Sequence, residues 1–350
     1  MRRRQPAEWE PQQCVLLAWP HHDSDWAPLL DDVEAEYLEL VAAILPRSPV
    51  MLCCRDEQHA RRVRGLAEGR GFDLNRVTLS VVPYNDTWIR DYGPLSVLRN
   101  GEPELVDFAF NGWGGRHQAA LDDRVSGALH RASAFGSLPM FRCDRVLEGG
   151  SIDCDGHGTL LATSRCVLNT NRGAAALPEI MERELMTWLG AERILWLDCG
   201  EIAGDDTDGH IDMLARFCDE ATIVFSTCED ERDANFGPLR QMHQQLSEFR
   251  RADGGVYRLV ALPLPRPLRA PGGQRLPASY ANFLIVNGAV IVPTYADPGD
   301  ERALDILRQC FPRYDVFATR ARALISQGGG VHCATMQLAA RPKPGTQETS

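Results

Sequence analysis

A single cysteine follows a run of three glycines close to the C-terminal end of the chain, in the segment 328–333. Glycines allow close backbone approach, and the N–H groups of such a turn can stabilise a thiolate or a developing negative charge. Cys333 is therefore a candidate nucleophile, since the thiolate is the reactive form of cysteine. A buried, unreactive thiol is the alternative. The adjacent His332 is a poor candidate for the base, because neighbouring residues of a strand point to opposite faces.

A second group of reactive side chains lies in the segment 205–212, where one histidine stands among several aspartates. If this segment is extended, Asp208, His210 and Asp212 share one face. A carboxylate on that face can orient the imidazole for acid–base catalysis, or the three side chains could ligate a divalent ion. A polar turn with a hydrogen-bonded histidine is the third interpretation.

A third candidate is the segment 85–94, which follows an apolar stretch and a proline and so lies at a strand end. Loops at strand ends are common binding positions. Trp88 and Asp91 could hold a cation together, one through its ring face and the other through its charge. The alternative is a surface ion pair beside a core tryptophan.

The composition narrows the possible chemistry. The 350 residues carry a net charge of −11, which gives no support to nucleic-acid binding and favours cationic ligands. The only lysine is Lys343, so a phosphate-loop lysine and a pyridoxal Schiff base are excluded. Eleven irregularly spaced cysteines without a C-x-x-C pair indicate reduced thiols rather than a zinc site. No apolar signal core or membrane-length apolar stretch is present, so we expect a cytoplasmic protein without membrane contact.

Apolar runs and amphipathic stretches predict a mixed α/β architecture without a strict βαβ rhythm. The strands are expected at 15–19, 50–53, 77–82, 95–98, 159–162, 194–197, 213–217, 222–226, 283–286 and 289–292. The helices are expected at 31–45, 178–189, 237–250 and 301–310. The Pro-, Arg- and Gly-rich stretch 262–277 is predicted to be a loop, so residues 1–340 form one domain, followed by a disordered tail at 341–350.

An ordered set of motifs resembles the agmatine deiminase family, part of the guanidine-modifying superfamily that includes peptidylarginine deiminases. The motifs lie at 6–11 with 18–20, 85–94, 110–115, 147–159, 205–212, 278–283 and 328–333. The resemblance implies the pentein (α/β-propeller) fold, with five ββαβ-like units around a pseudo-fivefold axis and a central channel. It also implies a homo-oligomer and no metal or organic cofactor.

The resemblance further implies a role for each motif residue. Cys333 resembles the nucleophile and His210 the general acid/base, while Asp91 and Asp212 resemble the carboxylates that grip the guanidinium. The expected reaction converts agmatine to N-carbamoylputrescine and ammonia through a covalent amidino-cysteine. A guanidinium is a planar fork of donors that matches two carboxylates, which makes this assignment chemically coherent.

The distal half of the substrate is less constrained by the motifs. Trp88 resembles a residue that stacks along the substrate, Asp206 one near the distal ammonium, and Glu148 a supporting acid. Many members carry Asp-Asp where this chain has Asn85-Asp86. Other guanidines, such as free or peptidyl arginine, therefore remain open.

Three alternatives to an agmatine deiminase stay open from the sequence. Free arginine would need a cationic partner for its α-carboxylate, and Arg90 and Arg116 are available. A metal-dependent hydrolase would use Asp208, His210 and Asp212. A non-catalytic binding module is the third, although binding alone needs no nucleophile.

Overall fold

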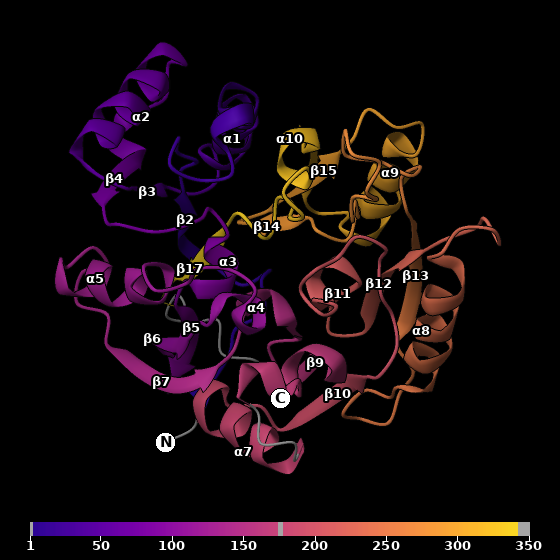
Figure 1. The fold of residues 1–350 in the computed structure, drawn as a ribbon. Coiled ribbons are helices and arrows are strands. Elements are labelled where there is room, and N and C mark those ends of the chain that lie inside the picture. Colours follow the sequence, from indigo (N-terminus) through magenta and orange to yellow (C-terminus); the bar gives the residue numbers. More distant parts are fainter. Residues whose placement is uncertain (1–2, 174–177, 342–350) are drawn as a thin grey trace.

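The computed structural model describes residues 3–173 and 178–341. Within these ranges the strands form five small sheets, which follow one another around the molecule in chain order (Figure 1). The strands, sheet by sheet, are β2 (Gln12–Ala18), β3 (Val50–Cys54) and β4 (Val77–Val81) with β17 (Met336–Ala339); β5 (Leu95–Arg99), β6 (Glu102–Ala109) and β7 (Met140–Val146) with β1 (Arg3–Arg4); β8 (Ile152–Cys154), β9 (Thr159–Thr163) and β10 (Arg193–Leu197); β11 (Ala215–Asp219), β12 (Thr222–Thr227) and β13 (Arg258–Pro263); β14 (Leu284–Val286), β15 (Ala289–Thr294) and β16 (Asp315–Arg320).

The sheets share one local plan. Two strands pair antiparallel, a helix crosses over, and the next strand pairs parallel, as in β14, β15, α9 and β16. The sheet that contains the last strand, β17, follows the same plan, because β17 pairs antiparallel with β2 and β3 pairs parallel with β2. The longer helices are α1 (Leu30–Ile44), α2 (Glu57–Gly69), α5 (Val125–Arg131), α7 (Pro178–Leu189), α8 (Phe236–Glu248) and α9 (Asp300–Cys310). The short ones are α3 (Ile89–Tyr92), α4 (Gly112–Gly115), α6 (Ser164–Val167) and α10 (Arg322–Ile325).

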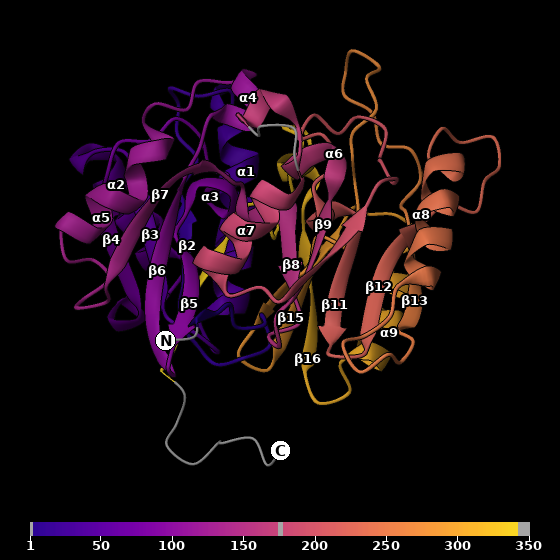
Figure 2. The ribbon, with the colours of Figure 1, turned by 90° about the horizontal axis from the view of Figure 1, so that it is seen from below.

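The sheets and helices are held together by apolar burial. Strand β15 is buried through its run Ala-Val-Ile-Val-Pro, as expected for a central strand covered on both faces. Helix α9 buries Ala303, Leu304, Leu307 and Cys310, which recur at helical spacing and face its sheet. The crossover helices lie on the outside of the ring of sheets (Figure 1), and the perpendicular view places α4 at one end of the molecule (Figure 2).

Most of the predicted elements are present. Every predicted strand and helix has a counterpart within a few residues, although Met213 belongs to a 3₁₀ turn before β11 rather than to the strand. The missed strands, such as β7 and β16, carry charged residues that interrupt the apolar pattern. The stretch 262–277 is a loop after the end of β13, as predicted. All of the predicted tail except Arg341 lies outside the described residues. Among these residues, no helix combines the length and the apolar character that a membrane span requires.

Five polar side chains, four of them site candidates from the sequence, share one repeated position, the segment just before the first strand of each unit. Asp91 precedes β5, Glu148 precedes β8, Asp212 precedes β11, Asn282 precedes β14 and Cys333 precedes β17. Each unit thus contributes one side chain from the same structural location. Contacts among these side chains, described next, show that the five segments converge.

Candidate active site

A pocket enclosing about 550 Å³ of empty space brings the predicted site residues together. Cys333, His210, Asp91, Trp88 and Asp206 all line it. The sixth predicted residue, Asp212, lies behind the lining, where its Oδ2 is 3.5 Å from Cys333 Sγ. The remaining lining residues are Asp25, Asp86, Trp113, His117, Asp205, Thr207, Met213, Gln327, Gly328 and Gly329.

The glycine run before Cys333 is explained by close packing. A Cβ on Gly329 would lie 2.4 Å from the ring of Trp88, and a Cβ on Gly330 would lie 2.4 Å from Asn282 Oδ1. No side chain fits at either position. Cys333 follows in a turn rather than in a strand, so the reason given above for rejecting His332 was wrong. His332 is nevertheless directed away from the pocket, toward Asp212 and Glu8.

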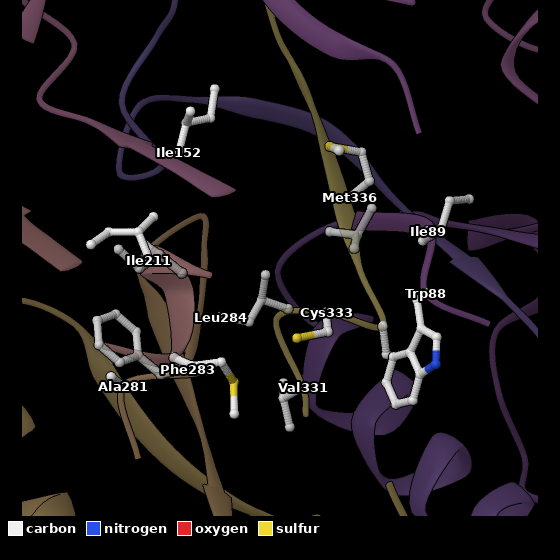
Figure 3. Close-up of a cluster of buried hydrophobic side chains, with 14 of the residues drawn as sticks. Trp88, Ile89, Ile152, Ile211, Ala281, Phe283, Leu284, Val331, Cys333 and Met336 are labelled. Atoms are coloured by element: carbon white, nitrogen blue, oxygen red, sulfur yellow. The ribbon is translucent and has the colours of Figure 1, made fainter. Parts of the chain in front are cut away.

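Cys333 is held in an apolar and anionic environment. Figure 3 shows its thiol among buried side chains that include Trp88 and Phe283. Asn282 Nδ2 donates a hydrogen bond to Sγ at 3.2 Å. Burial, followed by the charges of Asp212 and Asp91, raises the pKa of the Cys333 thiol well above its ordinary value, although Gly330 and Asn282 oppose the shift. Without a bound cation, this cysteine is a neutral thiol.

His210 is clamped between two carboxylates. Its Nε2 lies 3.0 Å from Glu148 Oε2 and its Nδ1 lies 3.6 Å from Asp91 Oδ1. Burial would lower the pKa of His210, but Asp91, Cys166 and Glu148 outweigh it and raise the pKa well above its ordinary value. His210 is therefore an imidazolium, able to donate a proton.

Glu148, which the sequence marked only as a supporting acid, is fixed by a cation. Arg172 Nε donates to both of its oxygens, at 3.0 and 2.8 Å. Burial would raise the pKa of Glu148, but His210 and Arg172 lower it. Glu148 thus stays ionised and orients the imidazole of His210, which is the role of the third group in many nucleophile–base arrangements.

The two carboxylates expected to grip a guanidinium differ in their surroundings. Asp91 accepts hydrogen bonds from Trp113 Nε1 and from the N–H of Gly150, both at 2.9 Å. Burial raises the pKa of Asp91 to about 6, with further contributions from Asp212 and Glu148 that His210 partly opposes. Burial would also raise the pKa of Asp212, but His332, together with His210 and Arg216, lowers it.

The extended segment expected at 205–212 is not found. Asp208 has a φ of +68° and residues Ile211–Met213 form a 3₁₀ turn, so Asp208, His210 and Asp212 do not share a face. Asp208 instead pairs with Arg172 at 2.6 Å and with Arg116 at 2.5 Å. The alternative in which Asp208, His210 and Asp212 together ligate a metal ion is therefore wrong.

A different set of ligand atoms does cluster within the described residues. Glu148, Cys166 and His210 offer ligand atoms within 4.8 Å of one another. The guanidinium of Arg172 already occupies the open side of Glu148. A second cation there would be strongly repelled, so this cluster does not fit a metal ion.

The mouth of the pocket is acidic. Five of the lining residues are aspartates, and no arginine or lysine belongs to the lining that the structure describes. Asp206 is exposed and lies 3.5 Å from His117 Nε2. Arg90 is buried beneath the site against Glu8, and Arg116 pairs with Asp208. Arg116 also donates to the backbone oxygen of Asp206, but neither arginine belongs to the described lining, so the lining itself offers no arginine to an α-carboxylate.

Four residues that hydrogen-bond to the side chains described above were not predicted as site residues. Glu8, Trp113, Arg172 and Asn282 each contact a site residue. Glu8, Trp113 and Asn282 lie within motifs that were noted only for their resemblance. Arg172 lies in no motif, and nothing in its sequence neighbourhood distinguishes it from the other arginines.

The comparisons with known proteins agree with this geometry. Residues 4–339 match the family model of Porphyromonas-type peptidyl-arginine deiminase. The chain is 33% identical to an agmatine deiminase of Stutzerimonas stutzeri, over 95% of this chain and 94% of that one. It is 34% identical to an agmatine deiminase of Pseudomonas syringae, over 95% and 94%.

Solved structures show the same likeness. A substrate-bound cysteine-to-serine variant of C. jejuni agmatine deiminase gives a TM-score of 0.89 with 35% identity, covering 97% of each chain. A putative arginine deiminase of Porphyromonas gingivalis also gives a TM-score of 0.89, with 43% identity over 96% of this chain and 98% of that one. These similarities confirm the α/β pentein fold expected from the motifs.

Proposed function

This chain belongs to the agmatine deiminase family, within the Porphyromonas-type peptidyl-arginine deiminases, and from that premise we propose that it hydrolyses agmatine to N-carbamoylputrescine and ammonia. It is then a hydrolase acting on a C–N bond of a linear amidine. One observation carries the proposal: a buried cysteine, an imidazolium and two carboxylates meet at the end of an acidic pocket.

Substrate binding follows from charge and hydrogen-bonding capacity. Asp212 Oδ1 is buried and has no hydrogen-bond partner among the described residues, so it is an available acceptor. Asp91 stands on the other side of Gly150, whose Cβ, if present, would contact both Asp91 Oδ1 and Asp212 Oδ2. A planar guanidinium between these carboxylates presents its central carbon to Cys333 Sγ.

The bound cation also activates the nucleophile. The anionic surroundings that raise the pKa of Cys333 are neutralised when a guanidinium enters, so the thiol releases its proton to solvent more readily. Sγ then attacks the guanidinium carbon. His210 donates its proton to the departing nitrogen, the C–N bond breaks, and ammonia leaves a covalent amidino-cysteine.

The second half-reaction reuses the same groups. His210, now neutral and held by Glu148, takes a proton from water as the oxygen attacks the amidino carbon. The C–S bond breaks, the electron pair returns to sulfur, the hydroxyl proton of the adduct restores the Cys333 thiol, and the ureido product leaves. Glu148 keeps the imidazole oriented through both steps.

The acidic mouth of the pocket provides the proposed binding position for the amine end of agmatine. Asp206 is the proposed partner of the distal ammonium, and Trp88 packs along the alkyl chain. Free arginine carries an α-carboxylate, which would enter a pocket whose described lining has five aspartates and neither arginine nor lysine. The pocket therefore disfavours arginine electrostatically.

The test compares agmatine, free arginine and a peptidyl arginine with the purified protein in the presence of a chelator. Ammonia and the ureido product are followed by mass spectrometry. We expect turnover of agmatine, complete loss of turnover in Cys333→Ser with the fold retained, and normal turnover in the control Cys228→Ser, a half-buried thiol outside the pocket. Activity in Cys333→Ser would overturn the proposal that Cys333 is the nucleophile. Turnover of arginine alone would overturn the proposal that agmatine is the substrate.

Four further expectations from the sequence belong to the same proposal. They are a cytoplasmic location, a homo-oligomer, a single domain over residues 1–340, and chemistry that requires no cofactor. The first two rest on composition and on the family resemblance. Light scattering of the purified protein tests the oligomeric state, and full activity after exhaustive chelation tests independence from metal.

A further inference from the structure

Beneath the pocket, a buried histidine joins two carboxylates. His332 Nδ1 lies 2.8 Å from Asp212 Oδ2, and His332 Nε2 lies 2.6 Å from Glu8 Oε1. Glu8 is held in turn by Arg216 at 2.6 Å and by Arg90 at 3.3 Å. The chain of contacts runs from two arginines through Glu8 and His332 to the carboxylate that faces Cys333.

The hydrogen bonds fix the charge of this histidine. Burial would raise the pKa of Glu8, but Arg216, His332 and Arg90 hold it well below its ordinary value. The pKa of Asp212 is lowered as well, against the effect of its burial, mainly by His332. Ionised carboxylates only accept hydrogen bonds, and a neutral imidazole has a single donor. Both contacts of His332 can therefore be hydrogen bonds to ionised carboxylates only when each ring nitrogen carries a proton.

The contact with His332 fixes the orientation of the Asp212 carboxylate. Its Oδ2 is engaged by His332, while its Oδ1 keeps no partner among the described residues. A carboxylate with one oxygen tethered and the other free has a defined direction. Without the tether, a fully buried anion would protonate or turn toward another donor.

We propose that Glu8 and His332 are positioning residues that keep Asp212 ionised and aim its free oxygen at the cationic amidine group of the substrate. This inference rests on the proposed function only in naming the amidine as the substrate group. His332 does not line the pocket, so it acts through Asp212. The other charged groups that face this network are Arg90, Arg216 and Asp153.

The first test measures how Cys333 discriminates a cation, independently of turnover. Cys333 is alkylated by a haloacetamidine, which is cationic, and by the matching neutral haloacetamide, and the ratio of the two rates is taken. Loss of the charge-assisted bond in His332→Gln should lower this ratio about tenfold or more. The matched control is His59→Gln, since His59 is also buried and contacts backbone groups through both ring nitrogens away from the pocket.

Steady-state kinetics separate positioning from general damage. In His332→Gln the KM for agmatine should rise about 30-fold while kcat falls less, because the lost interaction already exists in the bound ground state. Glu8→Gln should shift both readouts in the same direction by a smaller factor. An unchanged alkylation ratio and KM in folded His332→Gln would overturn the inference even if agmatine is the substrate.

A measurement on the unmutated protein covers the case in which the variants do not fold. In ¹⁵N-histidine NMR of the folded protein, both ring nitrogens of His332 should carry a proton, as two simultaneous hydrogen bonds to ionised carboxylates require. A singly protonated ring would refute the inference. If agmatine is not turned over but the alkylation ratio and the NMR signature hold, the proposed function fails and the positioning role stands.

Discussion

Replacing Asp91 by asparagine should make the stability of the ligand-free protein less dependent on pH. Asp91 is buried, and its pKa is raised from 3.8 to about 6. The folded state therefore binds this proton more tightly than the unfolded state does. Stability is gained as pH falls from about 6 toward 4, and above pH 6 the ionised carboxylate destabilises the fold.

The size of the effect follows from the shift. A shift of about 2 pKa units corresponds to about 3 kcal/mol, of which about 2 kcal/mol develops between pH 7.5 and pH 4.5. Asparagine also loses one of the bonds from Trp113 and Gly150, but that loss does not depend on pH and cancels in the difference. Asp91 is the largest of the charges that raise the pKa of His210, but Glu148 still lies 3.0 Å from the imidazole in the variant, so we expect His210 to stay protonated between pH 4.5 and pH 7.5 in both proteins.

The assay is urea unfolding of the wild type and Asp91→Asn at the two pH values, followed by circular dichroism. Lowering the pH should stabilise the wild type relative to Asp91→Asn by about 2 kcal/mol. Asp144→Asn, at an exposed aspartate, is the matched control and should follow the wild type. An identical pH response of wild type and Asp91→Asn, or a wild type that weakens relative to the variant at low pH, would refute the reasoning.

Three other substitutions test the remaining parts of the site. Glu148→Gln removes a charge that raises the pKa of His210; kcat should fall about 100-fold, with the alkaline limb of its pH profile moved to lower pH. Normal kcat would show that Glu148 does not orient the imidazole. Gly329→Ala places a Cβ against the ring of Trp88, so KM for agmatine should rise severalfold and tryptophan fluorescence should change. Asp206→Asn should raise KM about threefold with kcat nearly unchanged, since exposed ion pairs are weak, and an equal loss with an amine-free alkylguanidine would contradict its proposed role.

The structure brings the predicted site residues together, but the geometry of one of their segments differs from the expectation. Cys333, Asp91 and His210 stand out because each lies at a polar or glycine-rich break before a strand, where a side chain is free to serve chemistry. The extended conformation expected for 205–212 was wrong, because Asp208 adopts a positive φ in which it pairs with Arg172 and Arg116. No pattern in a single sequence reveals that pairing.

The parts of the site that escaped prediction are those that depend on convergence of the units. Asn282, to which the sequence assigned no role, and Glu148, which it assigned only as a supporting acid, lie before β14 and β8, in the position that Cys333 and Asp91 occupy before β17 and β5. The equivalence is visible only once the repeated pairing of strands is known. Helix periodicity and apolar runs identify most of the elements, but they do not say which strand ends meet.

The anionic character of the pocket links recognition to reactivity. The charges that attract a guanidinium are the same charges that keep Cys333 protonated, since Asp212 and Asp91 both raise the pKa of its thiol. A neutral ligand that enters the pocket leaves these charges in place and therefore leaves the thiol much less reactive. A cation neutralises them and lowers the cost of the thiolate at the moment when the electrophilic carbon is in position. The same carboxylates thus select cationic amidines in two steps. They favour binding of the cation, and they allow the Cys333 thiolate to form readily only when the cation is bound.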